Sequence, residues 1–238
     1  MADNIRFFSA GPLSVLAIVL LVILVLLLIP LFIFGIIGAA FTRLGLSWVA
    51  ALALVLLMLA GSFVNIPFYC IRRDMVRAAP LGPDGNLLAA RFAAQPVWET
   101  VLSVNLGGGI IPMCIAAFLV YHAVMVTGIT VLLIVFLCAA LVLVITFVST
   151  HEIAGIGIRV PFIIPALTAL LTGVLLTGGT GLTSAVTALA GGTLGTIAGG
   201  NLAHLCHVRD LEVPEISIGG SGTFGAVFLC CVLPALIA

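Results

Sequence analysis

Few residues in this chain could carry out chemistry, and they lie near the ends of apolar segments. The segment HLCH offers His204, Cys206 and His207, which are residue types that bind zinc. Three ligands within four residues of one helix do not converge easily on one ion, and no fourth ligand is nearby in the sequence. His151 and Glu152 could contribute only if the fold brings them close. We therefore expect a solvated cluster, with no metal site and no bound cofactor.

The chain also lacks the sequence patterns of common catalytic sites. It contains no G-x-S-x-G, P-loop or HExxH pattern. All eight Asp and Glu residues lie outside the long apolar segments. Proton-coupled transporters and intramembrane aspartyl proteases usually need one or two carboxylates within the membrane. These features predict that the protein is not an enzyme.

The remaining sequence consists of long apolar segments. Hydrophobic residues make up 63% of the 238 residues and charged residues 7%, whereas soluble domains carry about 25% charged residues. So few charges cannot cover a protein surface in water, which predicts an integral membrane protein with the lipid bilayer as its partner. Continuous apolar runs without alternation exclude a membrane β-barrel. The six cysteines form no CxxC pair, and a net charge of zero gives no reason to expect nucleic acid.

The uncharged segments predict an all-α, polytopic fold, because a helix of about 20 residues crosses a bilayer. The seven expected transmembrane helices lie near 12–40, 47–69, 106–122, 126–149, 161–178, 183–201 and 218–238. Together they form a single transmembrane domain over 1–238, with one extended hydrophilic loop at 70–105. The first span is long and contains Pro30, so it is tilted or kinked, or else divided in two, which would give eight spans.

The arginines predict the orientation, since the chain has no lysine. With the N-terminus inside, every arginine except Arg43 falls on the cytoplasmic side. This bias predicts a cytoplasmic N-terminus, a cytoplasmic 70–105 loop and a C-terminus outside. The long apolar N-terminal stretch is expected to be a retained anchor rather than a cleaved signal peptide. We expect a multi-pass protein of a prokaryotic cytoplasmic (inner) membrane.

Three predicted spans begin with glycine-rich segments: NLGGGIIP from Asn105, GIGIRVPFIIP from Gly155 and SIGGSGTFGAVFL from Ser217. In the expected topology all three helix N-termini lie at the cytoplasmic face. A helix N-terminus presents unpaired N–H groups and about half a positive charge, and glycine lets the backbone approach a ligand or a neighbouring helix. Transporters use interrupted helices in this way to hold substrates.

Amide and hydroxyl side chains are expected at the same level, because polar groups at membrane depth face the protein interior. They form a predicted polar layer of Asn65, Asn105, Asn201, Ser221 and Thr223. Two interpretations stay open: the layer is a ligand pocket, or its members only cap helices. The candidate ligand-binding residues are Asn65, Asn105, Gly107, Gly108, Arg159, Asn201, His204, Ser221, Thr223 and Gly225.

A second group of glycines lies within the span at 183–201. Gly191, Gly195 and Gly199 are spaced by four residues and so share one helical face. Such a glycine zipper lets helix backbones approach closely in lipid. We expect these three residues to serve helix packing, with Gly192 and Gly200 widening the face, and this helix to be central.

Five segments together resemble an uncharacterised membrane family, domain of unknown function 1614: LGLS…GSFVNIPFY, NLGGGIIP, GIGIRVPFIIP, AGGTLGTIAGGNL and SIGGSGTFGAVFL. In that family the last two motifs usually read like GADLL and GTFDGIFL, each with an aspartate. The corresponding positions here are Asn201 and Gly225. The resemblance implies a paired-aspartate site in relatives, as in a cation or proton site or a presenilin-type protease. Glycine cannot replace a carboxylate in acid–base chemistry, so the site would persist here without its charge.

These observations predict a non-catalytic membrane protein. It would act as an accessory or scaffold subunit, with other membrane-protein subunits as partners, or bind a small ligand through the glycine-rich polar layer. One alternative is a small-solute transporter or permease. Another is an inactive relative of an intramembrane aspartyl protease, in which Asn201 and Gly225 lie close together across the last two spans.

Overall fold

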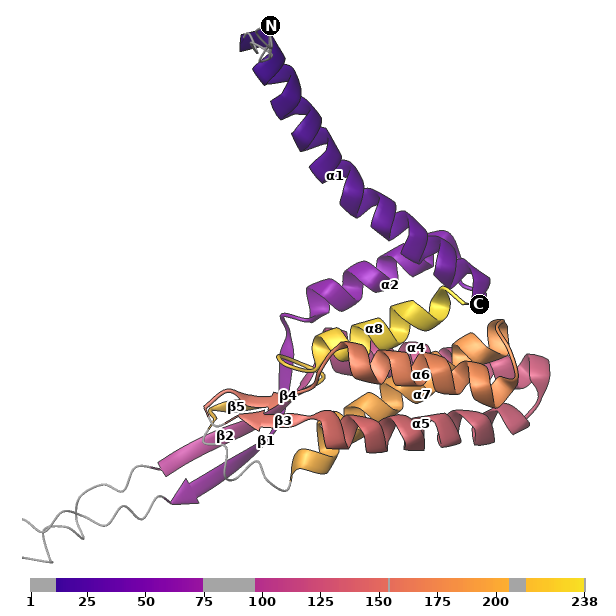
Figure 1. Ribbon diagram of the computed structural model, residues 1–238. Helices are drawn as coiled ribbons and strands as arrows, with labels where there is room; N and C mark the ends of the chain where they lie inside the picture. Colours follow the sequence, from indigo (N-terminus) through magenta and orange to yellow (C-terminus); the bar gives the residue numbers. More distant parts are fainter. Residues whose placement is uncertain (1–11, 75–96, 154, 206–212, 238) are drawn as a thin grey trace, which may run out of the picture.

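The computed structural model describes residues 12–74, 97–153, 155–205 and 213–237, and most of them are helical. The α-helices are α1 (Pro12–Arg43), α2 (Trp48–Gly61), α4 (Ile111–Thr127), α5 (Thr130–Ser149), α6 (Ile163–Thr177), α7 (Leu182–Gly200) and α8 (Phe224–Ala235). A short π-helix, η1 (Leu106–Ile110), leads into α4. The strands are β1 (Asn65–Asp74), β2 (Val97–Asn105), β3 (His151–Ile153), β4 (Gly157–Arg159) and β5 (Glu215–Ile218). Figure 1 shows a helical bundle with the strands at one end and α1 projecting away from it.

Among the described residues, four helical segments are long and apolar enough to cross a membrane: Val19–Arg43, Leu106–Thr127, Thr130–Ser149 and Leu182–Leu205. Their length and composition suggest a membrane protein. The helices α2, α6 and α8 have 14, 15 and 12 residues, fewer than the about 20 that a hydrocarbon core requires. The spans predicted at 47–69, 161–178 and 218–238 are therefore shorter helices than expected.

The strands explain two of these shorter helices and correct the prediction of an all-α fold. The apolar segment after α2 continues as β1, where aromatic residues and Pro67 suit an edge strand better than a helix. Before α8, Gly219 and Gly222 have φ angles of 74° and 95°, which a right-handed helix does not contain. Helical structure therefore begins at Phe224, and the fold is mostly helical rather than all-α.

A three-stranded sheet has the order β1–β2–β5. β1 and β2 are antiparallel, with Asn65 opposite Asn105, and β5 joins β2 in parallel, with Ser217 opposite Ser103. The ends of the predicted 70–105 loop are thus strands, while residues 75–96 lie outside the described part of the chain. The strands β3 and β4 form a separate antiparallel hairpin. Each strand region connects two helices at the same end of the bundle, so α4, α6 and α8 all begin beside the strands (Figure 1).

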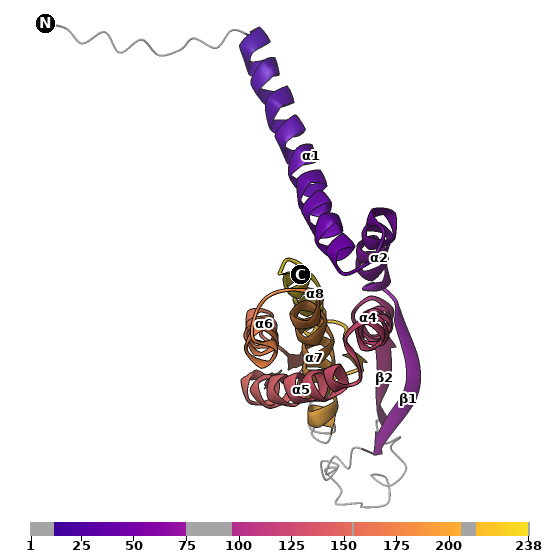
Figure 2. The ribbon, with the colours of Figure 1, turned by 90° about the vertical axis from the view of Figure 1, so that its right-hand side faces the viewer.

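Helix α7 lies at the centre of the bundle, with α4, α5, α6 and α8 around it (Figure 2). Nearly all of its residues from Ser184 to Gly200 are buried. A Cβ atom at Gly191 would lie 2.7 Å from Cys138 of α5, and one at Gly195 would lie 2.6 Å from the Ala139 carbonyl oxygen. A Cβ at Gly199 would overlap the Leu143 carbonyl group. The backbones of α5 and α7 can therefore approach this closely only because no side chains separate them.

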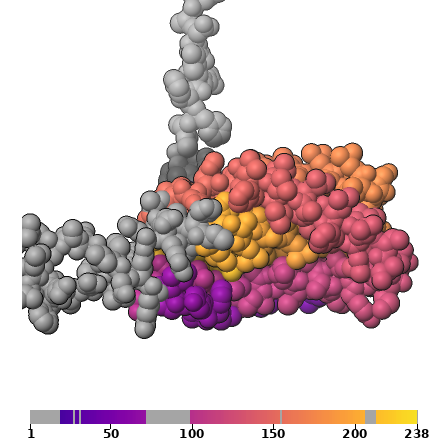
Figure 3. All heavy atoms as spheres, turned by 90° about the horizontal axis from the view of Figure 1, so that it is seen from below, coloured from indigo at the N-terminus to yellow at the C-terminus, as the bar shows by residue number. Residues whose placement is uncertain are grey.

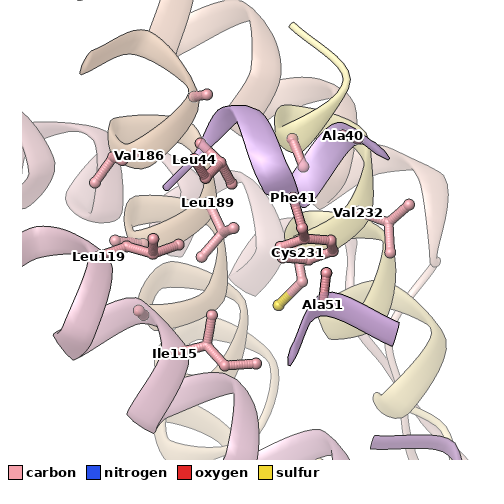
Figure 4. Packing of buried hydrophobic residues seen from close by; sticks show 14 of the residues in the cluster. Ala40, Phe41, Leu44, Ala51, Ile115, Leu119, Val186, Leu189, Cys231 and Val232 are labelled. Atoms are coloured by element: carbon pink, nitrogen blue, oxygen red, sulfur yellow. The ribbon is translucent and has the colours of Figure 1, made fainter. Parts of the chain in front are cut away.

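The largest apolar core lies where the end of α1 meets α2, α4, α7 and α8. Phe41 and Leu44 are each only 1% exposed and anchor the end of α1 in this core, and Figure 4 shows Leu44 near Leu189 and Phe41 near Cys231. The outer face of the bundle is also apolar. The residues with high exposure on α5 include Leu133, Phe136 and Val148, at 73%, 73% and 75%. Figure 3 shows a continuous surface on this side of the bundle, with a strip of α7 in gold.

Candidate functional site

Residues 217–223, which comprise the end of β5 and its connection to α8, lie where several glycine-rich segments meet. We call this segment the junction turn. The Gly222 carbonyl accepts a hydrogen bond from the Val160 backbone N–H at 2.9 Å, which ties the turn to the start of α6. A Cβ atom at Gly222 would overlap the Ile158 carbonyl, and one at Gly219 would overlap the Gly108 carbonyl. Glycine is therefore required where the turn touches the other segments.

The start of α4 is joined to the end of α2 in the same way. Leu106 donates its backbone N–H to the Val64 carbonyl at 2.9 Å. A Cβ atom at Gly107 would overlap Met58 and Ser62 at the end of α2. The predicted ligand-binding residues Gly107 and Gly108 are thus buried against backbone of α2 and of the junction turn, respectively. Their positions favour packing of one segment on another over contact with a ligand.

Asn105 connects three of these segments and is only 1% exposed. Its Nδ2 group donates to the Ser62 carbonyl at 2.7 Å and to Asn65 Oδ1 at 2.9 Å. Its Oδ1 accepts a hydrogen bond from the Gly108 backbone N–H at 2.8 Å, so this residue caps η1. For Asn105, the structure shows the capping role that the sequence left open.

Asn201 fastens the end of α7 to the junction turn and is also 1% exposed. Its Nδ2 donates to Thr223 Oγ1 at 3.1 Å, and its Oδ1 accepts from the Gly219 backbone N–H at 3.3 Å. On the other side of the turn, the Ser217 hydroxyl donates to Asn65 Oδ1 at 2.7 Å. A Cβ atom at Gly220 would overlap Ser217, so this third glycine allows the contact with Asn65.

A partly open cavity of about 100 Å³ lies beside the junction turn. Its described lining contains five polar side chains and four other residues: Asn65, Asn201, Glu215, Ser217, Ser221, Ile156, Gly157, Ile158 and Ile216. Asn201 is buried, whereas Asn65, Glu215 and Ser221 are exposed and form the rim. Because one water molecule needs about 10–15 Å³ of such space, the cavity can hold a small hydrated ligand. Three of the residues predicted to bind a ligand, Asn65, Asn201 and Ser221, line it together.

Glu215 and Ser217 were not predicted as site residues. Glu215 Oε1 accepts a hydrogen bond from the Ser103 hydroxyl at 2.6 Å, and Ser103 is fully buried. Successive side chains in a strand alternate between its two faces, so Glu215 and Ser217 share one face, and Ile216 and Ile218 are buried on the other. This alternation in EISI is the sequence signal that could have identified both residues.

Other predicted site residues lie outside the described lining of this cavity. Arg159 is exposed at the end of β4. His204 is 5% exposed; its Nδ1 lies 3.0 Å from the Gly199 carbonyl oxygen and its Nε2 lies 3.9 Å from Glu152 Oε1. The fold thus brings Glu152 to His204, whereas Cys206 and His207 lie outside the described residues.

Gly225 and Asn201 have different surroundings. Gly225 is exposed in the first turn of α8, and the nearest atom to a Cβ added there would be Phe162 Cβ at 3.5 Å. Asn201 is buried against Thr223. The described lining of the cavity includes Asn201 but not Gly225. The two positions at which the family resemblance implies aspartates therefore do not share this cavity.

No curated protein and no solved structure matches this chain. The profile of a family described as protein of unknown function (DUF1614) matches residues 59–237, well over half of the chain. The matched region contains all of the segments that meet at the junction turn and leaves out α1 and most of α2. The resemblance inferred from the five motifs is confirmed, and the chain belongs to the DUF1614 family.

Proposed function

We propose that this protein is a non-catalytic membrane protein that binds a small polar ligand in the cavity beside the junction turn. The observation that carries this proposal is the composition of the cavity. Its lining comes from the start of β1, the β3–β4 hairpin, the end of α7 and the segment from β5 to the junction turn. Binding sites of this kind place a few convergent polar groups at the meeting point of structural elements.

The polar residues at the strand end of the bundle divide into structural and ligand-facing residues. Asn105 and Thr223 are each 1% exposed and hydrogen-bonded to neighbouring segments, so they hold the fold together. Glu215, Ser217 and Ser221 instead line an accessible cavity. Apolar side chains that filled this space would stabilise the fold better than a polar cavity does. Ligand binding therefore explains the polar lining better than stability does. This division supports a site rather than a set of helix caps alone.

The chemistry of the cavity supports binding rather than catalysis. Acid–base or covalent catalysis requires a nucleophile within hydrogen-bond reach of a base, or two acidic groups in different protonation states. Glu215 is the one acidic side chain among the described lining residues, and it accepts a hydrogen bond from the Ser103 hydroxyl. Asn201 and Gly225 stand where the family resemblance implies aspartates, and neither can transfer a proton as a carboxylate does.

For the membrane arrangement, we propose that the strand end of the bundle faces the cytoplasm of a prokaryotic cell, with the protein in its inner membrane. The positive-inside pattern of the arginines supports this orientation. The exposed apolar surface of α1, which includes Phe32 at 70% exposure, would contact lipid or another membrane subunit. A reporter that is active only in the cytoplasm should be active when inserted within residues 75–96. It should be silent when fused after Ala238, and the reverse result at either position contradicts the orientation.

Ligand binding can be tested by thermal unfolding of the purified full-length protein in detergent. The test panel would contain sugars, amino acids and chloride salts of small cations. The variant Ser221→Phe places a large side chain at the cavity. The control variant Thr130→Phe introduces a side chain of the same size at an exposed position at the start of α5, away from the strands (Figure 1). A compound that stabilises wild type and Thr130→Phe, but not Ser221→Phe, supports the proposal. Equal responses of all three proteins, or no response to any compound, would reject it.

A further inference from the structure

The polar groups around the cavity are arranged so that several hydrogen-bond donors are already used within the protein. The Ser217 hydroxyl donates to Asn65 Oδ1, and the buried Ser103 hydroxyl donates to Glu215 Oε1. The Nδ2 group of Asn201 donates to Thr223 Oγ1. A hydroxyl whose hydrogen is engaged can only accept further bonds, through its oxygen lone pairs. The lining therefore offers acceptor oxygens to a ligand.

The charge of the cavity also favours a ligand that binds to acceptor oxygens. Glu215 is the only charged side chain among the described residues that line it. An ionised carboxylate is an acceptor with two oxygens and about four lone-pair sites, and one hydrogen bond from Ser103 leaves most of this capacity. An anion would be repelled by the negative charge of Glu215. A cation would find both a compensating charge and neutral oxygen ligands.

Building on the proposed function, we infer that the ligand is a small monovalent metal cation of the sodium class. Oxygen ligands from carboxylate, amide and hydroxyl groups suit hard cations, in contrast to the sulfur and imidazole ligands that transition metals prefer. Glu215 supplies one negative charge, which one sodium ion neutralises; a divalent ion would leave an excess positive charge beside the buried Asn201. Ser217, Ser221 and Asn201 supply the neutral oxygens.

The inference can be tested on the full-length protein in detergent by equilibrium binding of radioactive sodium and by thermal unfolding in sodium chloride. Choline chloride at equal ionic strength controls for screening and for the anion. Wild type should bind sodium saturably, and sodium rather than choline should raise its unfolding temperature. Glu215→Gln keeps the shape and the acceptor for Ser103 but removes the charge. It should weaken sodium binding by about tenfold or more, the factor that corresponds to 1.4 kcal/mol.

Two further variants make the result specific. Glu152→Gln removes a carboxylate that lies near His204 and outside the described cavity lining, so it should leave sodium binding unchanged. Glu215→Asp retains the charge and should bind sodium more tightly than Glu215→Gln does. A loss of binding in Glu152→Gln equal to that in Glu215→Gln would contradict the assignment, because it would indicate a general effect of charge.

The outcomes separate this inference from the proposed function. Tighter saturable binding of magnesium than of sodium would overturn the monovalent assignment. A different outcome is that an uncharged solute stabilises wild type but not Ser221→Phe, while sodium stabilises neither. In that case the cation inference fails and the proposed binding function stands. If neither sodium nor any other compound binds to wild type, both fail.

Discussion

The glycines of α7 and those around the junction turn occupy two different settings in one molecule. Along α7, Gly191, Gly195 and Gly199 all face the same neighbour, α5. Around the junction turn, Gly219 meets η1 and Gly222 meets β4. The first group brings two parallel stretches of backbone together along several helical turns. The second joins segments that are far apart in the sequence at one point.

This difference shows that a glycine-rich composition has two structural meanings here. Regular spacing within a helix indicates a face for close helix packing. Irregular clusters at helix starts indicate backbone that turns sharply and touches other backbone. A substitution in the first group should separate two helices and lower stability. A substitution in the second should also disturb the cavity, whose walls are the segments that the turn holds.

The largest effect is expected for Gly195→Leu, because the added side chain would enter the contact with Ala139 and Val142 of α5. Overpacking costs about 1–3 kcal/mol in typical cores, and we expect a loss of stability of about 3 kcal/mol or more for a side chain of this size. Thermal unfolding in detergent measures it. Gly35→Leu is the matched control in α1, since a Cβ at Gly35 would meet no atom within 4 Å. Equal stability of both variants would mean that Gly195 does not face a packed helix.

A smaller effect is expected for Gly219→Ala. The φ angle of 74° at Gly219 costs a residue with a Cβ about 1–2 kcal/mol, and the overlap with the Gly108 carbonyl adds to this. Gly178→Ala separates the two contributions, because Gly178 has a φ angle of 75° and open space around it. Gly219→Ala should be the less stable variant and should also lose ligand binding at the cavity. If the two variants behave alike, the contact between the junction turn and η1 is unimportant for stability and binding.

The predictability of these two regions from sequence differs for a physical reason. The α7 glycines recur every four residues, so their shared face follows from helix geometry alone. The polar layer was also partly predictable, and Asn65, Asn201 and Ser221 do line one cavity. Strand β1 could not be predicted from the sequence, because the segment from Phe63 to Cys70 is mostly apolar and follows a helix without an intervening charge. Glu215 was overlooked because a carboxylate in a connecting segment usually points into solvent, whereas pairing of β5 with β2 places it beside Ser103.

The smallest effect is expected for Gly225→Asp, the variant that introduces the aspartate implied by the family resemblance. The position is exposed, and Phe162 is the nearest neighbour of an added Cβ. A negative charge in the first turn of a helix is also favoured by the helix dipole. We expect a stability within about 0.5 kcal/mol of wild type. Asn201→Asp should cost more, because it buries a charge and removes the N–H group that donates to Thr223. The opposite order would place Gly225 inside the polar site.

The central claim is that distant glycine-rich and polar segments meet at the junction turn and build one cavity there. A double-mutant cycle between Asn65 and Ser217 tests it most directly, because these residues are far apart in the sequence and their side chains are 2.7 Å apart in the structure. Unfolding free energies of Asn65→Ala, Ser217→Ala and the double variant should give a coupling of about 0.5–1.5 kcal/mol, the usual contribution of a hydrogen bond. The control cycle pairs Asn65→Ala with Ser149→Ala. Among the described contacts, the Ser149 hydroxyl donates only to the Thr146 carbonyl within its own helix, so the effects of these two substitutions should be additive. Additivity in the Asn65–Ser217 cycle as well would contradict the account.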